Sequence, residues 1–344
     1  MNHTTIVLFG GPSDERHVSV ASAQAIVREL ARPQPGAQLH PLAWFWAPDG
    51  GIHDVAVEDL LAHQRPFEID FVPARPAIFQ DMEMALDALP VENPIFLLAL
   101  HGTGGEDGTV QAMFEKRGIA FTGSNAETSA LAFDKARTKE ALRDRVRMAE
   151  SRIARNAQEL HTVVKDMLTR HERVVLKPQA GGSSRGLYFV GAGDPVPDIR
   201  IPYMVEQFIS GRELTCAVID EGSGPRALPV LEIEVDPGRE FDYAGKYLGS
   251  GTREICPANI PDEMSRDAQA LAVAAHTGLG CEGYSRTDML ADGSDIYYLE
   301  TNTLPGLTVT SLVPKELRQA GIEFRDFLQK QLELGVSRGQ RVEV

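Results

Sequence analysis

The sequence predicts an α/β protein with more than one domain and a parallel sheet in its N-terminal part. Short apolar runs at residues 6–9 and 96–100 each lead into glycine-rich turns, and segments of helical periodicity lie between such runs. After Gly123 the character of the chain changes, and further strands alternate with helices. We therefore expect three domains, over residues 1–123, 124–209 and 210–344.

The first domain is expected to open with a strand, a turn and a helix. Gly10 and Gly11 end the first apolar run, and a helix is predicted from about Ser19 to Ala31. A strand over 96–100 precedes an amphipathic helix over 110–116. Residues 33–94 are rich in proline, alanine and aromatic side chains, and the sequence predicts no topology for them.

The other two domains are expected to mix strands and helices. In the second, a helix at 127–133 precedes a polar, arginine-rich segment that reaches about Leu160, and strands follow at 174–177, 187–190 and 203–208. In the third, the predicted elements are strands at 213–219 and 227–235, a helix at 262–277, strands at 285–290 and 296–300, and a helix at 324–334.

The composition narrows the class of protein. Of the 344 residues, 43% are hydrophobic and 24% are charged, which is ordinary for a folded soluble chain. The formal net charge of -15 repels phosphate backbones, so we expect no nucleic-acid partner. An anionic substrate must then be met by a local basic cluster.

Cysteine usage and the N-terminal segment indicate a cytoplasmic protein. Cys216, Cys256 and Cys281 are widely spaced and form no CxxC pair, so neither a zinc site nor a disulfide framework is expected. Residues 1–11 have no basic start, and no run approaches the ~20 apolar residues that span a bilayer. We expect no membrane association.

Two segments near the C-terminus carry candidate metal ligands. Side chains alternate faces along a strand, so Arg286 and Asp288 share one face, as do Glu300 and Asn302. If the two strands form a hairpin with residues 289–295 as its turn, then Asp288, Glu300 and Asn302 converge. Such oxygen ligands suit Mg²⁺ held together with phosphates. The alternative is an ordinary solvated sheet face.

Other candidate binding residues lie in loops at strand ends. Lys177 ends an apolar strand and precedes a glycine- and serine-rich loop over 181–186, whose backbone N–H groups can contact phosphates. It is not a Walker sequence, and a plain hairpin turn is the alternative. Glu206 and Glu213 flank an apolar strand end. His101 and Glu15 lie in turns after strands, where α/β proteins bind ligands.

Taken together and in this order, these stretches resemble the D-alanine–D-alanine ligase family of the ATP-grasp fold. The resemblance covers nearly the whole chain, through GGPSDERHVS, LALHGTGGEDGTVQ, VLKPQAGGSSRG, VEQFISGREL, FDYAGKY, CEGYSRTD and YYLETNTLPGLTVTSLVP. It implies a three-domain ATP-grasp fold with an N-terminal Rossmann-like domain. It also implies ATP-dependent joining of two D-alanines through an acyl phosphate, for peptidoglycan precursor synthesis.

The resemblance further implies a nucleotide and metal site between the second and third domains. Lys135 and Lys177 would bind the α- and β-phosphates of ATP, Glu206 the adenine and Glu213 the ribose. The loop over 182–186 would close over the γ-phosphate, and two Mg²⁺ ions, or Mn²⁺ in their place, would be bound by oxygen ligands. The remaining residues implied are Gly182, Ser183, Ser184 and Lys246 at the γ-phosphate, Phe208 and Ile209 at the nucleotide, and Asp288, Glu300 and Asn302 at the metal ions.

For the amino acids, the resemblance implies a second group of residues. Glu15 would bind the first ammonium group with His101 near its carboxylate, and Arg286 and the N–H of Gly306 would stabilise the oxyanion. Ser311 and the backbone of Leu312 would bind the second carboxylate. A hydrogen-bonded triad of Glu15, Ser183 and Tyr247 would close the site, and a homodimer is expected.

Some alternatives stay open. Another second substrate (D-serine, D-lactate or an L-amino acid) is the nearest one, although Tyr247 resembles the dipeptide-forming members. A catalytically silent nucleotide-binding module and a kinase that stops at the acyl phosphate are the others. The chain departs from the family's pattern in the arginine-rich segment 146–160, at Gly181 where relatives carry a carboxylate, and in the long region 33–94. These departures leave the choice of substrate open.

Overall fold

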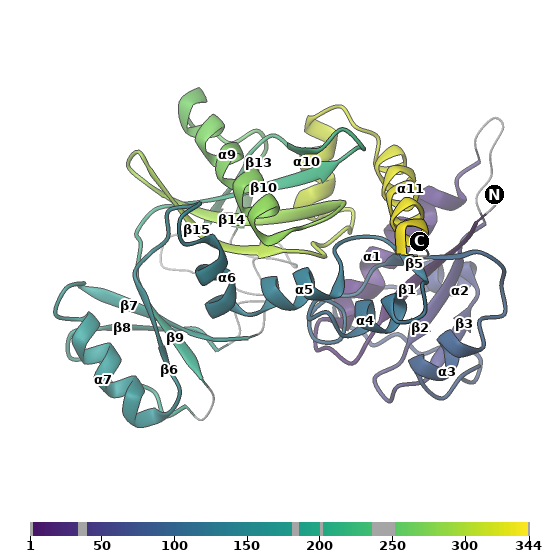
Figure 1. Ribbon diagram of the computed structural model, residues 1–344, viewed down its shortest axis with the longest axis horizontal. Coiled ribbons are helices and arrows are strands. Elements are labelled where there is room, and N and C mark those ends of the chain that lie inside the picture. The colour runs from purple at the N-terminus through teal and green to yellow at the C-terminus, as the bar shows by residue number, and fades with distance from the viewer. Residues whose placement is uncertain (1–2, 34–39, 181–185, 200–201, 236–251, 343–344) are drawn as a thin grey trace.

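The computed structural model describes residues 3–33, 40–180, 186–199, 202–235 and 252–342. They form three β-sheets with helices around them (Figure 1). This arrangement confirms the predicted α/β class. Among the described helices, none is long and apolar enough to cross a membrane.

The N-terminal sheet is parallel along most of its width. Its strands are β1 (Thr4–Gly10), β2 (Leu42–Trp46), β3 (Ile52–Val55), β4 (Pro94–Leu98) and β5 (Ala120–Phe121). Their order is β3-β2-β1-β4-β5, and only β3 runs antiparallel to its neighbour. Because helices cover both faces, β1 is a continuous apolar run buried on both sides. The helices here are α1 (Arg16–Ala31), α2 (Val57–Ala62), α3 (Met82–Asp87) and α4 (Thr109–Glu115).

A four-stranded antiparallel sheet forms the middle of the chain. Two short helices, α5 (Ala126–Phe133) and α6 (Lys135–Leu142), lead into it, and Asp134 caps α6 by accepting the N–H groups of Ala136 and Arg137. The sheet has the order β6-β9-β7-β8, and Figure 1 shows it set apart from the N-terminal sheet. Its elements are β6 (Ser151–Ala154), α7 (Ala157–Met167), β7 (Arg173–Pro178), β8 (Tyr188–Gly191) and β9 (Tyr203–Gln207).

The third sheet has six strands. The path β13-β12-β10-β14-β15 is antiparallel, and β11 adds to β10. The helices α9, α10 and α11 complete this part of the chain. The bounds are β10 (Arg212–Asp220), β11 (Pro225–Ala227), β12 (Leu231–Val235), β13 (Thr252–Ile255), α9 (Asp262–Leu279), β14 (Tyr284–Asp292), β15 (Asp295–Asn302), α10 (Leu312–Gln319) and α11 (Phe324–Val342).

The predicted hairpin of β14 and β15 is confirmed, but its predicted turn is wrong. Only Gly293 and Ser294 separate the strands, where we expected seven residues. Met289 and Ala291 are buried on one face of the strand, with the half-buried Leu290 between them, and their burial continues β14 beyond Asp288. Gly293 has a φ of 58°, which suits a two-residue turn.

Helix α11 returns from the third sheet to the first. Its Arg338 stacks 4.1 Å from the centroid of the Phe121 ring, donates to the carbonyl of Phe121 at 2.5 Å and pairs with Glu282 at 2.9 Å. The apolar core is continuous here, because Tyr284 and Phe327 belong to the same buried cluster as strand β1. The boundaries at 123 and 209 stay predictions; the described strands end at 121, resume at 151, end at 207 and resume at 212.

Candidate active site

The metal-ligand candidates lie opposite one another on the β14–β15 hairpin. Asp288 pairs in register with Glu300, and Arg286 with Asn302. Opposite residues in an antiparallel pair have Cβ atoms about 4.5–5.5 Å apart, so the three oxygen ligands share one patch of the sheet. Glu300 is a third exposed, which leaves the patch open on one side. Two carboxylates and one amide oxygen fit Mg²⁺ shared with phosphate oxygens.

Asp288 is held by neighbours on its own sheet. Its carboxylate accepts two hydrogen bonds from Arg286, from Nε at 2.8 Å and from Nη2 at 2.7 Å. Thr215 of β10, in register with Asp288, donates its hydroxyl at 2.6 Å. The bidentate pair fixes the guanidinium beside the metal-ligand candidates. Thr215 was not predicted, although it lies two residues from Glu213 on the same strand face.

Three lysines on α6 and β7 form ion pairs with Glu300 of the hairpin or with Glu206 of β9. The Nζ atom of Lys135 lies 4.0 Å from Oε2 of Glu300. Lys139, one helical turn later, and Lys177 of β7 both form ion pairs with Glu206 of β9, whose side chain is 3% exposed. Lys139 was not predicted, although its i+4 spacing from Lys135 was a usable signal.

The carboxylate of Glu206 and the two lysines paired with it shift one another's pKa values. Burial acts to raise the pKa of Glu206, but the ammonium groups of Lys177 and Lys139 outweigh it and hold that pKa below its ordinary value. Burial acts to lower the pKa of Lys177, yet the nearby charge of Glu206 keeps it above its ordinary value, with help from Glu300 and Glu213. Burial lowers the pKa of Lys139. The site is therefore a compact cluster of cations around one buried anion.

Two further nucleotide candidates follow β9. Ile209 is buried. The Phe208 ring packs against Phe189 at 5.8 Å between centroids, with the Arg173 guanidinium 5.0 Å above it, and the Phe208 N–H donates to the carbonyl of Arg173. The Phe208 ring therefore already packs within the middle sheet.

A second group of candidates gathers where α1 meets the loop before α10. His101 is buried, and its Nε2 lies 3.1 Å from the Ser22 hydroxyl of α1, which accepts the N–H of Leu307 at 3.3 Å. Its Nδ1 lies 3.5 Å from Glu106. Burial raises the pKa of Glu106, and the negative charge of Glu15 acts in the same direction, so Glu15 lies nearby. Ser22 and Glu106 were not predicted.

The loop itself brings Gly306 and Ser311 together. The Ser311 hydroxyl accepts the N–H of Thr308 at 3.1 Å and lies 2.7 Å from the Thr308 hydroxyl. A Cβ at Gly306 would lie 2.7 Å from the Ser311 oxygen, so only glycine fits without displacing that hydroxyl. Leu312 begins α10 directly afterwards. Backbone N–H groups at a helix start suit a carboxylate.

A buried carboxyl group links α10 to this sheet. Glu316 is fully buried, and its Oε2 accepts the N–H of Ala217 at 2.7 Å. That N–H lies where the ladder beside β10 is interrupted between β11 and β12, so neither strand pairs with Ala217. Burial raises the pKa of Glu316 well above its ordinary value. Glu316 therefore replaces a missing backbone acceptor and ties α10 to β10.

Some predicted residues lie outside the described part of the chain. These are Gly182, Ser183, Ser184, Lys246 and Tyr247, so their predicted roles stay predictions. Among the described residues, no three His, Cys, Asp or Glu side chains gather in a way that could hold a metal ion. The candidate set at the hairpin differs from such a group because its third ligand is an amide.

Comparisons with known proteins agree along most of the chain. The family described as "D-ala D-ala ligase N-terminus" matches residues 4–124, and "D-ala D-ala ligase C-terminus" matches residues 144–333. A D-alanine–D-alanine ligase of Cupriavidus metallidurans is 34% identical over 336 residues, which cover 95% of this chain and 90% of that protein. One of Ralstonia nicotianae is 40% identical over 332 residues, with 94% and 88% covered.

A solved structure supports the same fold. The VanG D-Ala:D-Ser ligase from Enterococcus faecalis superposes with a TM-score of 0.80 at 27% identity, covering 97% of this chain and 100% of that one. The predicted ATP-grasp fold, with its N-terminal parallel-sheet domain, is confirmed.

Proposed function

Because this chain belongs to the D-alanine–D-alanine ligase family, we propose that it joins two D-alanines into D-alanyl-D-alanine at the expense of ATP, for peptidoglycan precursor synthesis. The observation that carries the proposal is the β14–β15 hairpin, where Asp288 and Glu300 stand opposite each other with Arg286 bound to Asp288 and Lys135 beside Glu300. Paired carboxylates for metal ions beside cations for phosphates are the parts that phosphoryl transfer needs.

We assign the nucleotide to the space between the middle sheet and this hairpin. Lys135 and Lys177 would bind the α- and β-phosphates, and Glu206, Phe208, Ile209 and Glu213 the nucleoside. Asp288, Glu300 and Asn302 would hold two Mg²⁺ ions, which neutralise charge on the phosphates when bound. The remaining assignments, on residues that the structure does not describe, are Gly182, Ser183, Ser184 and Lys246 at the γ-phosphate.

The reaction then has two steps. A carboxylate oxygen of the first D-alanine attacks the γ-phosphorus of ATP, and ADP leaves with the electron pair of the broken P–O bond. The amine of the second D-alanine attacks the carbonyl carbon of this acyl phosphate. The tetrahedral intermediate loses inorganic phosphate and a proton to give the amide. The guanidinium of Arg286 and the N–H of Gly306 would stabilise its oxyanion.

The amino acids would bind between α1 and the loop before α10. Glu15 would hold the first ammonium group near His101, while the Ser311 hydroxyl and the N–H of Leu312 bind the second carboxylate. The burial of His101 and the hydroxyl pair of Thr308 and Ser311 support a preorganised pocket. Tyr247 would join Glu15 and Ser183 in the closing triad.

We propose three further properties on the same basis. The chain would divide into domains at about residues 123 and 209, act in the cytoplasm and form a homodimer. A different second substrate is the alternative for the reaction, since one solved structure of this fold is a D-Ala:D-Ser ligase.

The test is ATP- and Mg²⁺-dependent phosphate release with D-alanine, D-serine, D-lactate and L-alanine in turn, with every product identified by mass. One D-alanyl-D-alanine per phosphate with D-alanine alone supports the proposal. Phosphate without any condensed product would indicate a kinase instead. Turnover only in mixtures containing another acceptor would favour the alternative substrate.

A further inference from the structure

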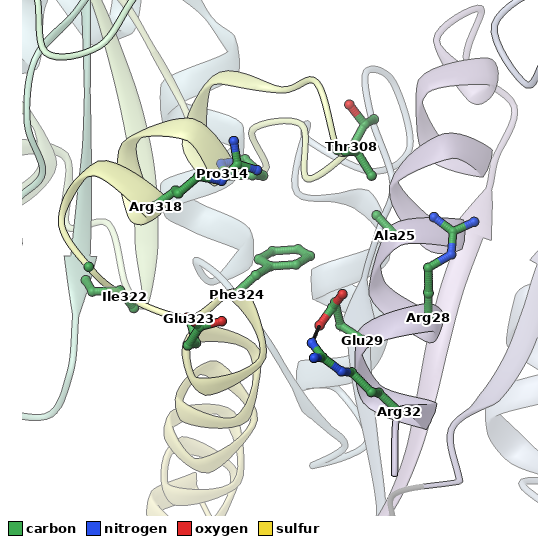
Figure 2. A pocket seen from close by; sticks show the side chains of 12 residues that line it. Ala25, Arg28, Glu29, Arg32, Thr308, Pro314, Arg318, Ile322, Glu323 and Phe324 are labelled. Atoms are coloured by element: carbon green, nitrogen blue, oxygen red, sulfur yellow. Dashed lines mark ion pairs between the residues drawn. The ribbon is translucent and has the colours of Figure 1, made fainter. Parts of the chain in front are cut away.

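A pocket of about 410 Å³ lies beside the candidate active site, between α1 and the segment that joins α10 to α11 (Figure 2). This volume is within the range of about 300–1,000 Å³ that is usual for small-molecule sites. None of the residues assigned to ATP, metal ions or D-alanine lines it. The lining residues are Ala25, Arg28, Glu29, Arg32, Thr308, Val309, Pro314, Arg318, Gly321, Ile322, Glu323 and Phe324.

Two arginines stand on opposite walls of this pocket without partners. Figure 2 shows Arg28 on α1 and Arg318 on α10 on either side of the cavity. Within the part of the chain that the structure describes, neither guanidinium forms an ion pair or a hydrogen bond. Arg32 differs, because it lies 3.6 Å from Glu29. Both side chains are exposed to solvent, where a ligand can reach them. The lining carries Arg28, Arg32 and Arg318 against Glu29 and Glu323, so it is locally positive in a chain with 49 acidic and 34 basic residues, and such a surface favours an anion.

A further arginine, buried behind the pocket wall, adds positive charge. Arg325 is 3% exposed, and its Nη1 donates to the carbonyls of Glu29 at 2.8 Å and Arg32 at 2.5 Å. Its Nε and Nη2 have no hydrogen-bond partner among the described residues. These two hydrogen bonds satisfy carbonyl groups at the C-terminus of α1, the negative end of the helix dipole. The C-terminus of the helix therefore repels a nearby anion less strongly. A buried guanidinium without a carboxylate raises the local potential.

The rest of the lining is apolar or carries the opposite charge. Ala25, Pro314 and Ile322 contribute apolar wall, and the Phe324 ring projects into the cavity (Figure 2). Glu323, exposed on the rim, disfavours a ligand with several negative charges. The lining therefore suits one carboxylate or phosphate group attached to an apolar or planar body.

We propose that this pocket binds a small organic anion, whose charged group contacts Arg28 and Arg318 and whose apolar part packs on Phe324. Binding of the anion changes the position of groups that hold the second amino acid. Thr308 lines the pocket, and its hydroxyl lies 2.7 Å from that of Ser311. A ligand that shifts Thr308 therefore shifts a group assigned to the carboxylate of the second amino acid, so this coupling rests on the proposed function.

Binding is tested by calorimetric titration of the full-length protein saturated with ADP and Mg²⁺, so that its nucleotide site is filled. The probes are benzoate, inorganic phosphate and the neutral benzamide. The variant is Arg28→Gln/Arg318→Gln, and the control is Arg65→Gln/Arg226→Gln, two exposed arginines that are each paired with a carboxylate and do not line the pocket. We expect at least tenfold weaker anion binding in the variant and wild-type binding in the control.

The probes separate the possible charged groups. Tighter binding of benzoate than of phosphate identifies a carboxylate site, and the reverse order a phosphate site. Benzamide binding as tightly as benzoate overturns the proposal. Equal affinity of wild type and variant for both anions overturns it as well. Because these titrations need no turnover, their outcome is independent of whether D-alanine is the substrate.

Coupling is tested by the KM for the second D-alanine with and without the tighter probe. We expect the probe to change this KM at least threefold in the wild type and not in Arg28→Gln/Arg318→Gln. Without the probe, this variant should keep the wild-type kcat and KM. An equal change of KM in wild type and variant overturns the coupling and leaves the titration result as the test of binding.

Discussion

Replacing Glu206 by glutamine should destabilise the middle sheet strongly. The substitution keeps the shape of the side chain but removes the anion between Lys139 and Lys177, all three side chains being at most 15% exposed. Removal of one partner from a buried ion pair costs about 3–5 kcal/mol. Two ammonium groups left near one another repel by about 4 kcal/mol at roughly 4 Å and an effective dielectric constant of about 20, which accounts for a cost of this size.

The decisive comparison is with the double variant Glu206→Gln/Lys139→Met. It removes one of the two like charges and keeps the length of the side chain, so it should recover more than half of the lost stability. Hydrogen exchange of peptides from β7 and β9 measures the local opening free energy. A loss of about 3–5 kcal/mol appears as at least hundredfold faster exchange in the single variant, since about 1.4 kcal/mol is tenfold.

Glu150→Gln is the matched control. Glu150 precedes the neighbouring strand β6 and pairs with Arg170 and His171 at the surface, where such pairs contribute at most about 1 kcal/mol. In this control variant, the hydrogen-exchange rates of peptides from β7 and β9 should stay within fivefold of those in the wild type. Unchanged exchange in Glu206→Gln, or a double variant no better protected than the single one, would refute the reasoning from shared charge.

Three other predictions concern separate parts of the chain. Glu300→Gln should reduce turnover at least a hundredfold while Glu234→Gln, an exposed carboxylate on the same sheet, keeps it; equal rates would remove Glu300 from the metal site. Glu316→Leu should raise the KM for the second D-alanine and lower the melting temperature, because the Ala217 N–H loses its acceptor. Glu316→Gln keeps a carbonyl at this place and should have the wild-type KM and melting temperature. If the glutamine variant is as impaired as the leucine variant, this role of Glu316 is contradicted. Burial lowers the pKa of His276 to about 4 from an ordinary 6.5, so below pH 6.5 the unfolded chain binds the proton more readily, and stability should fall by roughly 3 kcal/mol between pH 6.5 and 4. Urea unfolding across that range should show a smaller loss in His276→Asn, and identical pH dependence would contradict the assignment.

The sequence predicted those parts of the molecule that depend on local pattern. Alternation along two strands was enough to put Asp288 and Glu300 on one face of a hairpin, and the register confirms that they stand opposite each other. The turn was misjudged because Met289 and Ala291, read as loop, continue the alternation into a buried face. Local polarity does not distinguish a loop from a strand whose other face is packed.

Groups that support the candidate site through distant contacts escaped prediction. Lys139 meets Glu206, 67 positions later in the chain, and Thr215 meets Asp288 across a strand pair. Glu316 owes its place to an interruption of the ladder between β11 and β12, which no periodicity reveals. In each case the partner is set by how the sheets stack, and a single sequence does not encode that arrangement in its local pattern.

The return of α11 to the N-terminal sheet has a consequence for how the chain acquires its structure. Residues as distant as Phe9 and Phe327 belong to one core, whereas the middle sheet has a core of its own. During synthesis the first sheet must therefore wait for the last helix before its surface at β5 is covered, because Gly335 lies against the Phe121 carbonyl there. All strands of the middle sheet have been synthesised about 130 residues before Gly335. This sheet can therefore form before α11 packs against the N-terminal sheet. The middle sheet is thus inserted into a larger body, whose core is complete only when α11 packs against the N-terminal sheet.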